Sequence, residues 1–459
     1  MEGRIDAHFY KSEFFELDKK IKNGQFECKR FGSLIKYISS GATPLKSESN
    51  KFYTDDKING IPLLRVQNIT EEGLMLDDVI FINSGTHTKD LKRSQVFEGD
   101  LLVTITGRIA SSAVAPENFE GNINQHSVMV RTNDLVLNKY LAIYFNSHLG
   151  QKFAIRVTTG GTRPALDYTA LKSLLIPVPP IETQQKVVAI FESAYQSKKA
   201  KEAEAKRLLD SIDAYLLEKL GIILPEKTAT KKTFFVNFAQ IQGNRFDPFY
   251  HKTEFEDKIK SIEKGTYPTM PTKKLLKAIK KGIEVGSNAY TDLGVPFIRV
   301  SDINNFGLDY ENADKKISQN LYETLKNDYQ PDINEILYSK DGTIGFCCVL
   351  DKVENCVTSG GILRLQPNNE IVNTLYLCYI LSLNLFKGLA ERISIGAVIK
   401  HLTMEEWLKI QIPLPPLSVQ EEIATHITGI RAAAKQLQAG AKTELETAKI
   451  AVEKMILGE

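Results

Sequence analysis

The segment PDINEILYSK, residues 331–340, contains the residue types of a metal-dependent nuclease, a Pro-Asp pair followed by Glu and Lys. In such enzymes carboxylates hold a divalent cation that activates water. The spacing does not fit this chemistry, because Glu335 and Lys340 stand five positions apart and the other half of the chain has EGDLLVTITG at this place. We therefore interpret residues 331–340 as the start of an ordinary strand.

Motifs for other catalytic chemistry are also missing from the sequence. It contains no GxxxxGK[ST] loop for phosphates, no FxGxG-like loop for S-adenosylmethionine and no [ND]PP[YF] motif for base methylation. The Pro-Pro pairs at 179–180 and 415–416 follow Val and Leu, which cannot hold an exocyclic amine. The seven histidines show no HExxH motif and no clustered spacing. We predict no catalytic residue and no metal site.

Length and composition predict at least two domains, because 459 residues exceed one ordinary core. The formal net charge of +2 shows no strong basic imbalance, although the 58 Lys and Arg residues can be unevenly distributed. The five cysteines form no CxxC pair, and neither a signal peptide nor a membrane-spanning run is present. These features predict a soluble cytoplasmic protein with reduced thiols.

One proline-rich phrase occurs twice, as IPVPPIETQQKV (176–187) and as IPLPPLSVQEEI (412–423). Other segments pair in the same order and at nearly constant offset, which independent chance matches would not do. The pairs are RIDAHFYKSEF with RFDPFYHKTEF, IPLLRVQNI with VPFIRVSDI, GDLLVTITGRIA with NEILYSKDGTIG, and NKYLAIYFNS with NTLYLCYILS. The chain is therefore a tandem duplication with halves far longer than a solenoid repeat.

Each half is predicted to open with a short helix, continue with a strand-rich region, and end in a long polar helix after the proline-rich phrase. The prolines favour an extended approach, and Glu182 or Thr183 and Ser418 are expected helix N-caps. Apolar residues then recur at steps of three and four, which predicts a coiled-coil seam. The seam residues are Ile423, Ile427, Ile430, Ala434, Leu437, Ala441, Leu445, Ala448, Val452 and Met455, aligned with Val187, Phe191, Ala194, Lys198, Lys201, Ala205, Leu209, Ile212, Leu216 and Leu220.

These two apolar stripes need partners, and the simplest solution packs one long helix antiparallel to the other. Dimerisation of two chains through the helices is the alternative. A helix of about 40 residues is about 60 Å long, so the pair would act as a spacer. Duplex DNA suits a duplicated protein with such a spacer, because half-sites about one helical turn apart match twofold protein symmetry.

The combination of motifs resembles the specificity subunit of type I restriction–modification systems. The resemblance is carried by the doubled I-P-x-P-P-[IL]-x-x-Q phrase, the helix after each copy, the P-[LF]-[LI]-R-V-x-[ND]-I and G-D-L-L strands, and the turn TTGGTRPAL (158–166). It covers nearly the whole chain. The second copy departs at that turn, where ISIGAVIKHL (393–402) keeps one glycine and no Arg-Pro, so a role for the turn is less secure there.

The resemblance implies two target recognition domains of mixed α/β (α+β) fold, joined by two long antiparallel coiled-coil helices. The expected boundaries are 1–180 for the first domain, 181–221 for its helix, 222–244 for a linker, 245–416 for the second domain and 417–459 for its helix. Each domain would read half of a split, asymmetric sequence in double-stranded DNA. The helices would set the gap and dock two methyltransferase subunits that use S-adenosylmethionine, with restriction subunits for translocation and cleavage. The specificity subunit itself would have neither a cofactor nor an activity.

Residues that contact DNA must supply cations for phosphates and polar groups for base edges. The candidates lie on expected turns, and each single Lys or Arg also fits an ordinary solvated charge. Arg65 and Arg299 fit phosphate contacts and internal braces equally. In the first half the candidates are Arg65, Lys89, Lys92, Arg93, Arg108, Gln125, His126, Thr162 and Arg163. In the second half they are Arg299, Lys340, Thr343, Ser359, Arg392 and Lys400.

A methyltransferase partner is expected to bind near the proline-rich phrase and the helices, with Tyr195, Lys198, Lys201 and Trp407 as candidate contacts. The two lysines would otherwise flank a hydrated gap between the helices or pair with acids such as Glu444. Three other functions fit the same chain. They are a two-headed DNA-binding regulator without a methyltransferase, a protein-only scaffold on a coiled-coil strut, and an enzyme whose site has no recognised motif.

Overall fold

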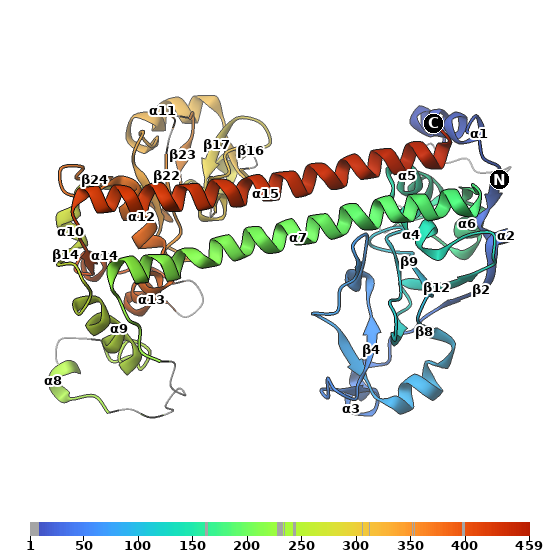
Figure 1. Ribbon diagram of the computed structural model, residues 1–459, viewed down its shortest axis with the longest axis horizontal. Coiled ribbons are helices and arrows are strands. Elements are labelled where there is room, and N and C mark those ends of the chain that lie inside the picture. Colours follow the sequence, from blue (N-terminus) through green and yellow to red (C-terminus); the bar gives the residue numbers. More distant parts are fainter. Residues whose placement is uncertain are drawn as a thin grey trace. The chain divides into compact units, whose positions relative to one another are not determined.

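The computed structural model describes residues 9–160, 164–226, 233, 235–241, 245–304, 306–311, 313–350, 352, 354–396 and 400–459. The chain forms two compact units (Figure 1). Unit 1 comprises residues 1–201 and 439–459, and unit 2 comprises residues 202–438. Two long helices, α7 (Ile181–Leu220) and α15 (Leu417–Leu457), contribute a part to each unit. Within the described residues, no helix is both long and apolar enough to cross a membrane.

In unit 1, short helices surround the sheets, and parts of the two long helices pack against them. Its other helices are α1 (Ser12–Lys22), α2 (Phe31–Leu34), η1 (Lys46–Glu48), α3 (Ser49–Phe52), η2 (Val66–Asn68), η3 (Thr86–Asp90), η4 (Lys92–Ser94), α4 (Asn138–Asn146), α5 (His148–Val157) and α6 (Tyr168–Ser173). Its strands are β1 (Cys28–Arg30), β2 (Ile35–Ser40), β3 (Tyr53–Thr54), β4 (Ile61–Leu64), β5 (Ile69–Thr70), β6 (Gly73–Leu74), β7 (Ile80–Ile82), β8 (Gln95–Phe97), β9 (Leu101–Thr104), β10 (Ser112–Val114), β11 (Glu120–Ile123), β12 (Ser127–Thr132) and β13 (Leu175–Pro177).

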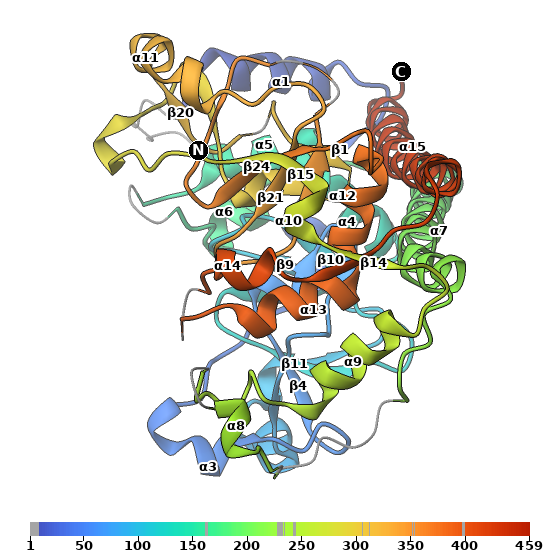
Figure 2. The same cartoon turned by 90° about the vertical axis from the view of Figure 1, so that its left-hand side faces the viewer.

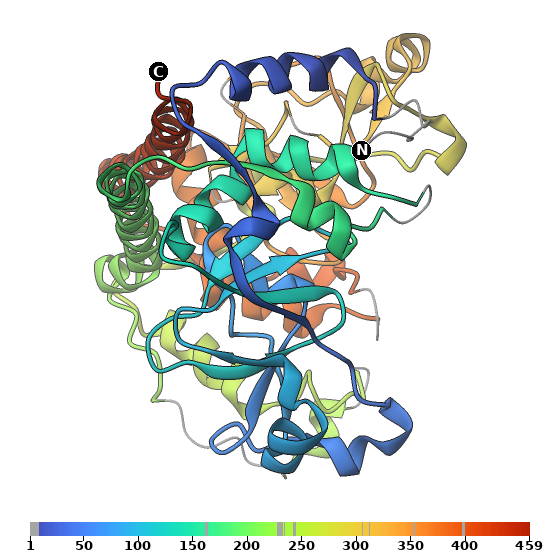
Figure 3. The ribbon, with the colours of Figure 1, turned by 90° about the vertical axis from the view of Figure 1, so that its right-hand side faces the viewer.

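Two sheets build most of unit 1. One has the order β10-β9-β12-β2 and is antiparallel, and the other has the order β3-β7-β4-β11-β8 with a parallel β4–β11 pair. The alternating strands bury one apolar face, which packs with α4, α5 and the end of α15 into a core that includes Val103, Val130, Phe145 and Ile456. Figure 3 shows α1 beside the end of α15, and their Ile21 and Leu457 share this core.

Unit 2 repeats this plan. Its helices are α8 (Phe238–Ile241), α9 (Thr253–Glu263), α10 (Thr272–Leu275), η5 (Ser287–Ala289), η6 (Val300–Asp302), α11 (Gln319–Tyr329), α12 (Thr374–Ser382), α13 (Asn384–Ile393) and α14 (Met404–Trp407). Its strands are β14 (Thr269–Pro271), β15 (Leu276–Lys281), β16 (Tyr290–Thr291), β17 (Val295–Ile298), β18 (Ile303–Asn304), β19 (Gly307–Leu308), β20 (Lys316–Ile317), β21 (Ile336–Ser339), β22 (Cys347–Val349), β23 (Val357–Thr358), β24 (Ile362–Pro367) and β25 (Gln411–Pro413).

The sheets of unit 2 have the orders β15-β24-β21-β22 and β16-β20-β17-β23, which correspond to those of unit 1. Figure 2 shows this unit facing the viewer, with α7 and α15 along one side of it. The halves differ most before β21, because the eleven-residue helix α11 replaces the irregular turns η3 and η4 and strand β8 of unit 1. The shared elements are thus the scaffold, and this segment is where the two halves diverge.

Residues of the repeated proline-rich phrase anchor each long helix to its domain. Gln184 is fully buried; its Oε1 accepts from Leu137 N (2.8 Å), and its Nε2 donates to the carbonyls of Leu135 and Pro179 (2.9 Å each). Gln420 makes the corresponding bonds to Asn373 N, Ile371 O and Pro415 O. Each buried glutamine therefore satisfies one proline carbonyl and two backbone groups of the segment before α4 or α12, which ties the start of the long helix to its domain.

A buried tyrosine completes the anchor in each half. Tyr140 and Tyr376 donate to the carbonyls of Pro177 and Pro413, both at 2.7 Å. Burial raises the pKa of both phenols, so the hydroxyls remain protonated donors at any physiological pH. The side-chain bonds of Gln184 and Gln420 explain why Gln recurs in both copies of the phrase, whereas the tyrosines bind carbonyls that any residue would supply.

Replacing Gln184 by leucine is expected to lower the free energy of unfolding by about 2–4 kcal/mol, because a buried N–H and two buried carbonyls lose their partner. Urea unfolding of the full chain measures the loss. Gln185→Leu is the matched control, since Gln185 is the exposed neighbour on the same helix. Equal midpoints for the two variants would contradict the anchoring role.

The long helices pack together in each unit through the predicted seam. In unit 1, Ala194 of α7 packs with Leu445 and Ala448 of α15. In unit 2, Lys219 of α7 pairs with Glu422 of α15 at 2.6 Å. The start of one helix thus meets the end of the other in each unit, which confirms the predicted antiparallel pair. The seam residues Ala205, Leu216, Ile427, Ala434 and Ala441 are almost completely buried.

Candidate nucleic-acid interface

Loops at one end of the four-stranded sheet of unit 1 bring distant residues together. Thr43, after β2, donates from Oγ1 to Oε1 of Gln125, before β12. Thr106, after β9, has its Oγ1 2.7 Å from Nδ1 of His126. Thr106 also pairs with Ala165, at the end of the glycine-rich turn. Because Gln125 and His126 are exposed, this loop end presents an amide and an imidazole to solvent.

Arg108 lies on the tight turn that follows Thr106 and is exposed. The backbone is left-handed at Gly107 (φ +73°) and at Ala110 (φ +58°), which turns the chain back toward β10. This turn places the Arg108 guanidinium on the surface next to the loop end. Two other candidates from the glycine-rich turn, Thr162 and Arg163, lie outside the described residues.

The same loop end exists in unit 2 with different side chains. Asp341, at the position of Thr106, lies 2.9 Å from Nδ1 of His401 and 2.5 Å from Nζ of Lys340. Glu284, at the position of Thr43, is exposed and lies against Gly360. Thr343 is exposed on the turn, as Arg108 is in unit 1. Unit 2 thus has carboxylates where unit 1 has the hydroxyls of Thr43 and Thr106, and the Asp341 carboxylate is already paired with Lys340 and His401.

These two sets of groups suit different base edges. Glutamine amides pair with adenine, whereas carboxylates accept from the amino group of cytosine. Sequence reasoning located the loops but missed Thr43, Thr106, Glu284 and Asp341. Alignment of the two halves is the signal that finds them, because they occupy matching places after matching strands.

The remaining candidates of unit 1 lie away from this loop end. Lys89, Lys92 and Arg93 are exposed on η3 and η4. Tyr37 of the edge strand β2 donates to the carbonyl of Arg93 (3.4 Å), so these cations flank the sheet edge. Their role in binding DNA stays a prediction.

Arg65 and Arg299 have the same local structure in both halves. Each follows a strand, and its backbone N–H donates to the side chain three positions on, Asn68 Oδ1 or Asp302 Oδ2. Arg65 lies 3.2 Å from Asp78, and Arg299 lies 3.4 Å from Asp314. The paired carboxylates favour the brace interpretation over a phosphate contact.

Several candidates of unit 2 are engaged by structural partners or buried, including Lys340, which pairs with Asp341. Arg392 donates from Nε to the carbonyl of Tyr250 (2.8 Å) and lies over that ring, as Arg156 does with Phe9 in unit 1. Ser359 is 8% exposed, which leaves its side chain little access to DNA. Lys400 lies 3.5 Å from Glu391. We correct Arg392 and Ser359 to structural roles, because their polar groups are engaged or buried.

The expected partner contact at Trp407 is wrong. Its side chain is 1% exposed, packs against Tyr338 and donates from Nε1 to the Tyr338 hydroxyl (3.2 Å). The residue is a core element of unit 2, so a partner cannot reach it. Trp407 is the only tryptophan in the sequence, and its place near the proline-rich phrase did not indicate whether its side chain is buried.

The candidates on α7 form ion pairs inside unit 1. Lys201 pairs with Glu444 of α15, as the alternative interpretation predicted. Lys198 pairs with Glu72, and the Tyr195 hydroxyl is 3.5 Å from the same carboxylate. Glu72 lies in the turn between β5 and β6, so this hairpin contacts the helix. The sequence did not predict this contact. Glu72 occupies Lys198 and the Tyr195 hydroxyl, which limits the access of a partner protein to both side chains.

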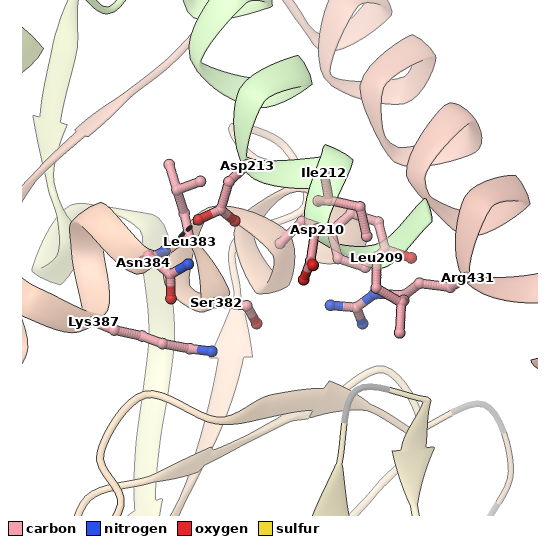
Figure 4. A pocket seen from close by; sticks show the side chains of 10 residues that line it. Leu209, Asp210, Ile212, Asp213, Ser382, Leu383, Asn384, Lys387 and Arg431 are labelled. Carbon is pink, nitrogen blue, oxygen red and sulfur yellow. Dashed lines mark hydrogen bonds between the residues drawn. The ribbon is translucent and has the colours of Figure 1, made fainter. Parts of the chain in front are cut away.

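A polar cavity of about 350 Å³ lies in unit 2 where α7, α12, α13 and α15 meet (Figure 4). Asp213 of α7 points to the start of α13 and accepts from Asn384 N at 3.2 Å, which caps that helix. A matching cavity of about 230 Å³ occurs in unit 1, where Glu453 accepts from Leu149 N at the start of α5. In each unit, the long helix that starts in the other half therefore caps a short helix of that unit. Among the described residues, no group of His, Cys, Asp and Glu could hold a metal ion.

Burial raises the pKa of Asp213, although the hydrogen bond from Asn384 opposes the shift. A raised pKa means that ionisation destabilises the folded chain at neutral pH, and that this penalty disappears as pH falls below the unfolded value. Replacing Asp213 by asparagine keeps an acceptor oxygen and should increase stability at pH 7 but not at pH 3. Thermal unfolding at both pH values tests this, and an equal effect at both would contradict it.

Comparison with known proteins places the chain in a family. The family model described as "Type I restriction modification DNA specificity domain" matches residues 23–207 and again residues 265–447. The chain belongs to this family. Two copies of the specificity domain correspond to the two homologous halves of the molecule, so the duplication and the resemblance noted in the sequence are confirmed.

One relative matches most of the chain and another matches about a third of it. The protein that carries the name type I restriction enzyme MjaX specificity subunit, from Methanocaldococcus jannaschii, is 24% identical over 441 residues, 93% of this chain and 92% of the relative. The EcoBI specificity subunit of Escherichia coli is 28% identical over 142 residues, 31% of this chain and 30% of the relative. A chain from a structure of the type I R-M system has a TM-score of 0.53 at 17% identity and covers 94% of this chain and 97% of its own, which shows the fold.

Proposed function

We propose that this specificity-family chain selects the DNA sequence for a type I restriction–modification complex and has no catalytic activity itself. Each domain reads one half of a split, asymmetric target. The observation that carries the proposal is the pair of equivalent loop ends, which share a scaffold and differ in polar groups. Thr43, Gln125 and His126 occupy one, and Glu284, Asp341 and His401 occupy the other.

The long helices have a separate role in this proposal. We infer that they set the number of base pairs between the half-sites and dock two methyltransferase subunits, which bring S-adenosylmethionine. Restriction subunits then add translocation and cleavage. The anchors at Gln184 and Gln420 support a fixed helix-to-domain geometry, because a loose joint could not define a gap.

Co-expression with the neighbouring methyltransferase gene tests the proposal, with modified bases in the host DNA as the readout. We expect one motif made of two short specified blocks and an unspecified gap. Exchanging residues 25–176 for the domain of a relative should then change one block only. Absence of modification together with failure to co-purify with the methyltransferase would contradict the proposal. DNA binding without the methyltransferase would favour the two-headed regulator.

A further inference from the structure

Five lysines form an uncompensated basic ridge on unit 2. The segment TKKLLKAIKK (272–281) covers α10 and β15 and places them within nine residues. All five are exposed, and in the described part of the chain none has a carboxylate within ion-pair distance. The ridge consists of Lys273, Lys274, Lys277, Lys280 and Lys281.

The sheet itself does not neutralise this charge. Strand β15 is an edge strand, and Lys280 stands opposite Arg364 of β24. The nearby carboxylate Glu335 is 2% exposed and already holds Arg364 at 2.7 Å. Lys277 falls at the register shift of the strand, which leaves it without a cross-strand partner. The ridge therefore keeps its positive charge at the surface.

The equivalent surface of unit 1 is different. The strand β2 has one lysine, Lys36, and this lysine pairs with Asp134 at 2.9 Å. The places of Lys280 and Lys281 are taken by Ser39 and Ser40. The basic ridge is therefore a property of the second half alone and not a requirement of the shared fold.

The ridge leads directly into the candidate interface of unit 2. Gly282 follows Lys281 and donates to Ile362 O at 3.1 Å, and the next residues reach Glu284 at the loop end. Gly360 donates to Ile283 O (2.9 Å), which ties the end of the ridge to the loop before β24. The lysines of the ridge thus lie next to the loop end whose polar groups would meet base edges. In duplex DNA the backbone phosphates flank the base edges, so the lysines would lie near phosphates.

We propose that the ridge, chiefly Lys280 and Lys281, binds phosphates that flank the half-site read by unit 2. The inference rests on the proposed function and adds named phosphate contacts for the second domain. Lysines also occur on edge strands to prevent strand pairing between molecules. That purely protective role predicts aggregation, not altered DNA binding, when the lysines are removed.

The test measures DNA affinity of the full chain in complex with its methyltransferase subunits at several KCl concentrations, with the modified sequence in a duplex probe. Each lost phosphate contact reduces the slope of log K against log salt by about 0.9, so Lys280→Gln with Lys281→Gln should reduce it by about 2. The control is Lys260→Gln with Lys264→Gln, two exposed lysines at the end of α9, which should leave the slope unchanged. Arginines at 280 and 281 should preserve it.

Three outcomes are distinguishable. A wild-type complex whose DNA binding is independent of salt and sequence refutes the proposed function. A wild-type slope that both glutamine variants share refutes the ridge and leaves the proposed function intact. Self-association of the Lys280→Gln, Lys281→Gln complex in light scattering, with an unchanged slope, assigns the lysines to edge protection and also overturns the inference.

Discussion

Replacing Arg364 by methionine should lower the free energy of unfolding of the chain by about 3–5 kcal/mol, because it leaves a buried carboxylate without its cation. Arg364 and Glu335 are 1% and 2% exposed. Their side chains meet at 2.7 Å and 3.2 Å, and Arg364 also donates to Asp328 O at 2.8 Å. Thermal and urea unfolding of the full chain measure the loss.

A double variant separates the ion pair from simple packing. Arg364→Met with Glu335→Leu removes both charges and should recover much of the stability, since apolar replacement of a buried pair is often neutral. The matched control in unit 1 is Arg131→Met, where the arginine that holds Asp100 is 44% exposed and a smaller loss is expected. A double variant no more stable than the single variant would contradict the role assigned to the unpaired charge.

The sequence was sufficient for the parts of the fold that repeat. Equal spacing of the paired motifs predicted two homologous halves, and apolar steps of three and four predicted the seam that Ala205, Leu216 and Ile427 form. The seam pattern is local, so helical periodicity alone predicts it, and the duplication is visible because whole segments recur in order. Pairing of Lys198 or Lys201 with an acid such as Glu444 was one of two alternatives to a partner contact, and Lys201 forms this pair.

The candidate site was predictable only in part. Turn glycines located the loops of Arg108 and Gln125, but the partners of these loops come from distant segments. Thr43 meets Gln125 across 82 positions, and Arg364 meets Glu335 across strands, so only strand pairing reveals them. The burial of Trp407 could not be predicted either. Composition does not tell which face of a four-residue helix turns inward.

Gly41 controls the approach of the loops at the candidate interface of unit 1. A Cβ at this position would lie 1.6 Å from the carbonyl oxygen of Ile123, closer than any real contact. Gly282, its counterpart in unit 2, would meet Ser359 O at 2.1 Å. The end of the edge strand therefore packs directly on the backbone that leads to Gln125, and only glycine leaves room.

Replacing Gly41 by alanine should thus cost about 3 kcal/mol or more, because the obstacle is backbone and cannot rotate away. The displaced strand end would also separate Thr43 from Gln125, so modification of the half-site read by unit 1 should fall while the other block stays specified. Gly440→Ala is the control, since its Cβ meets nothing within 4 Å on α15 and alanine should stabilise the helix by about 0.5–1 kcal/mol. Unfolding curves with opposite shifts for the two variants are the expected result. Equal shifts would show that the loops tolerate a wider separation, and the geometry of the loop end would then not depend on this close approach.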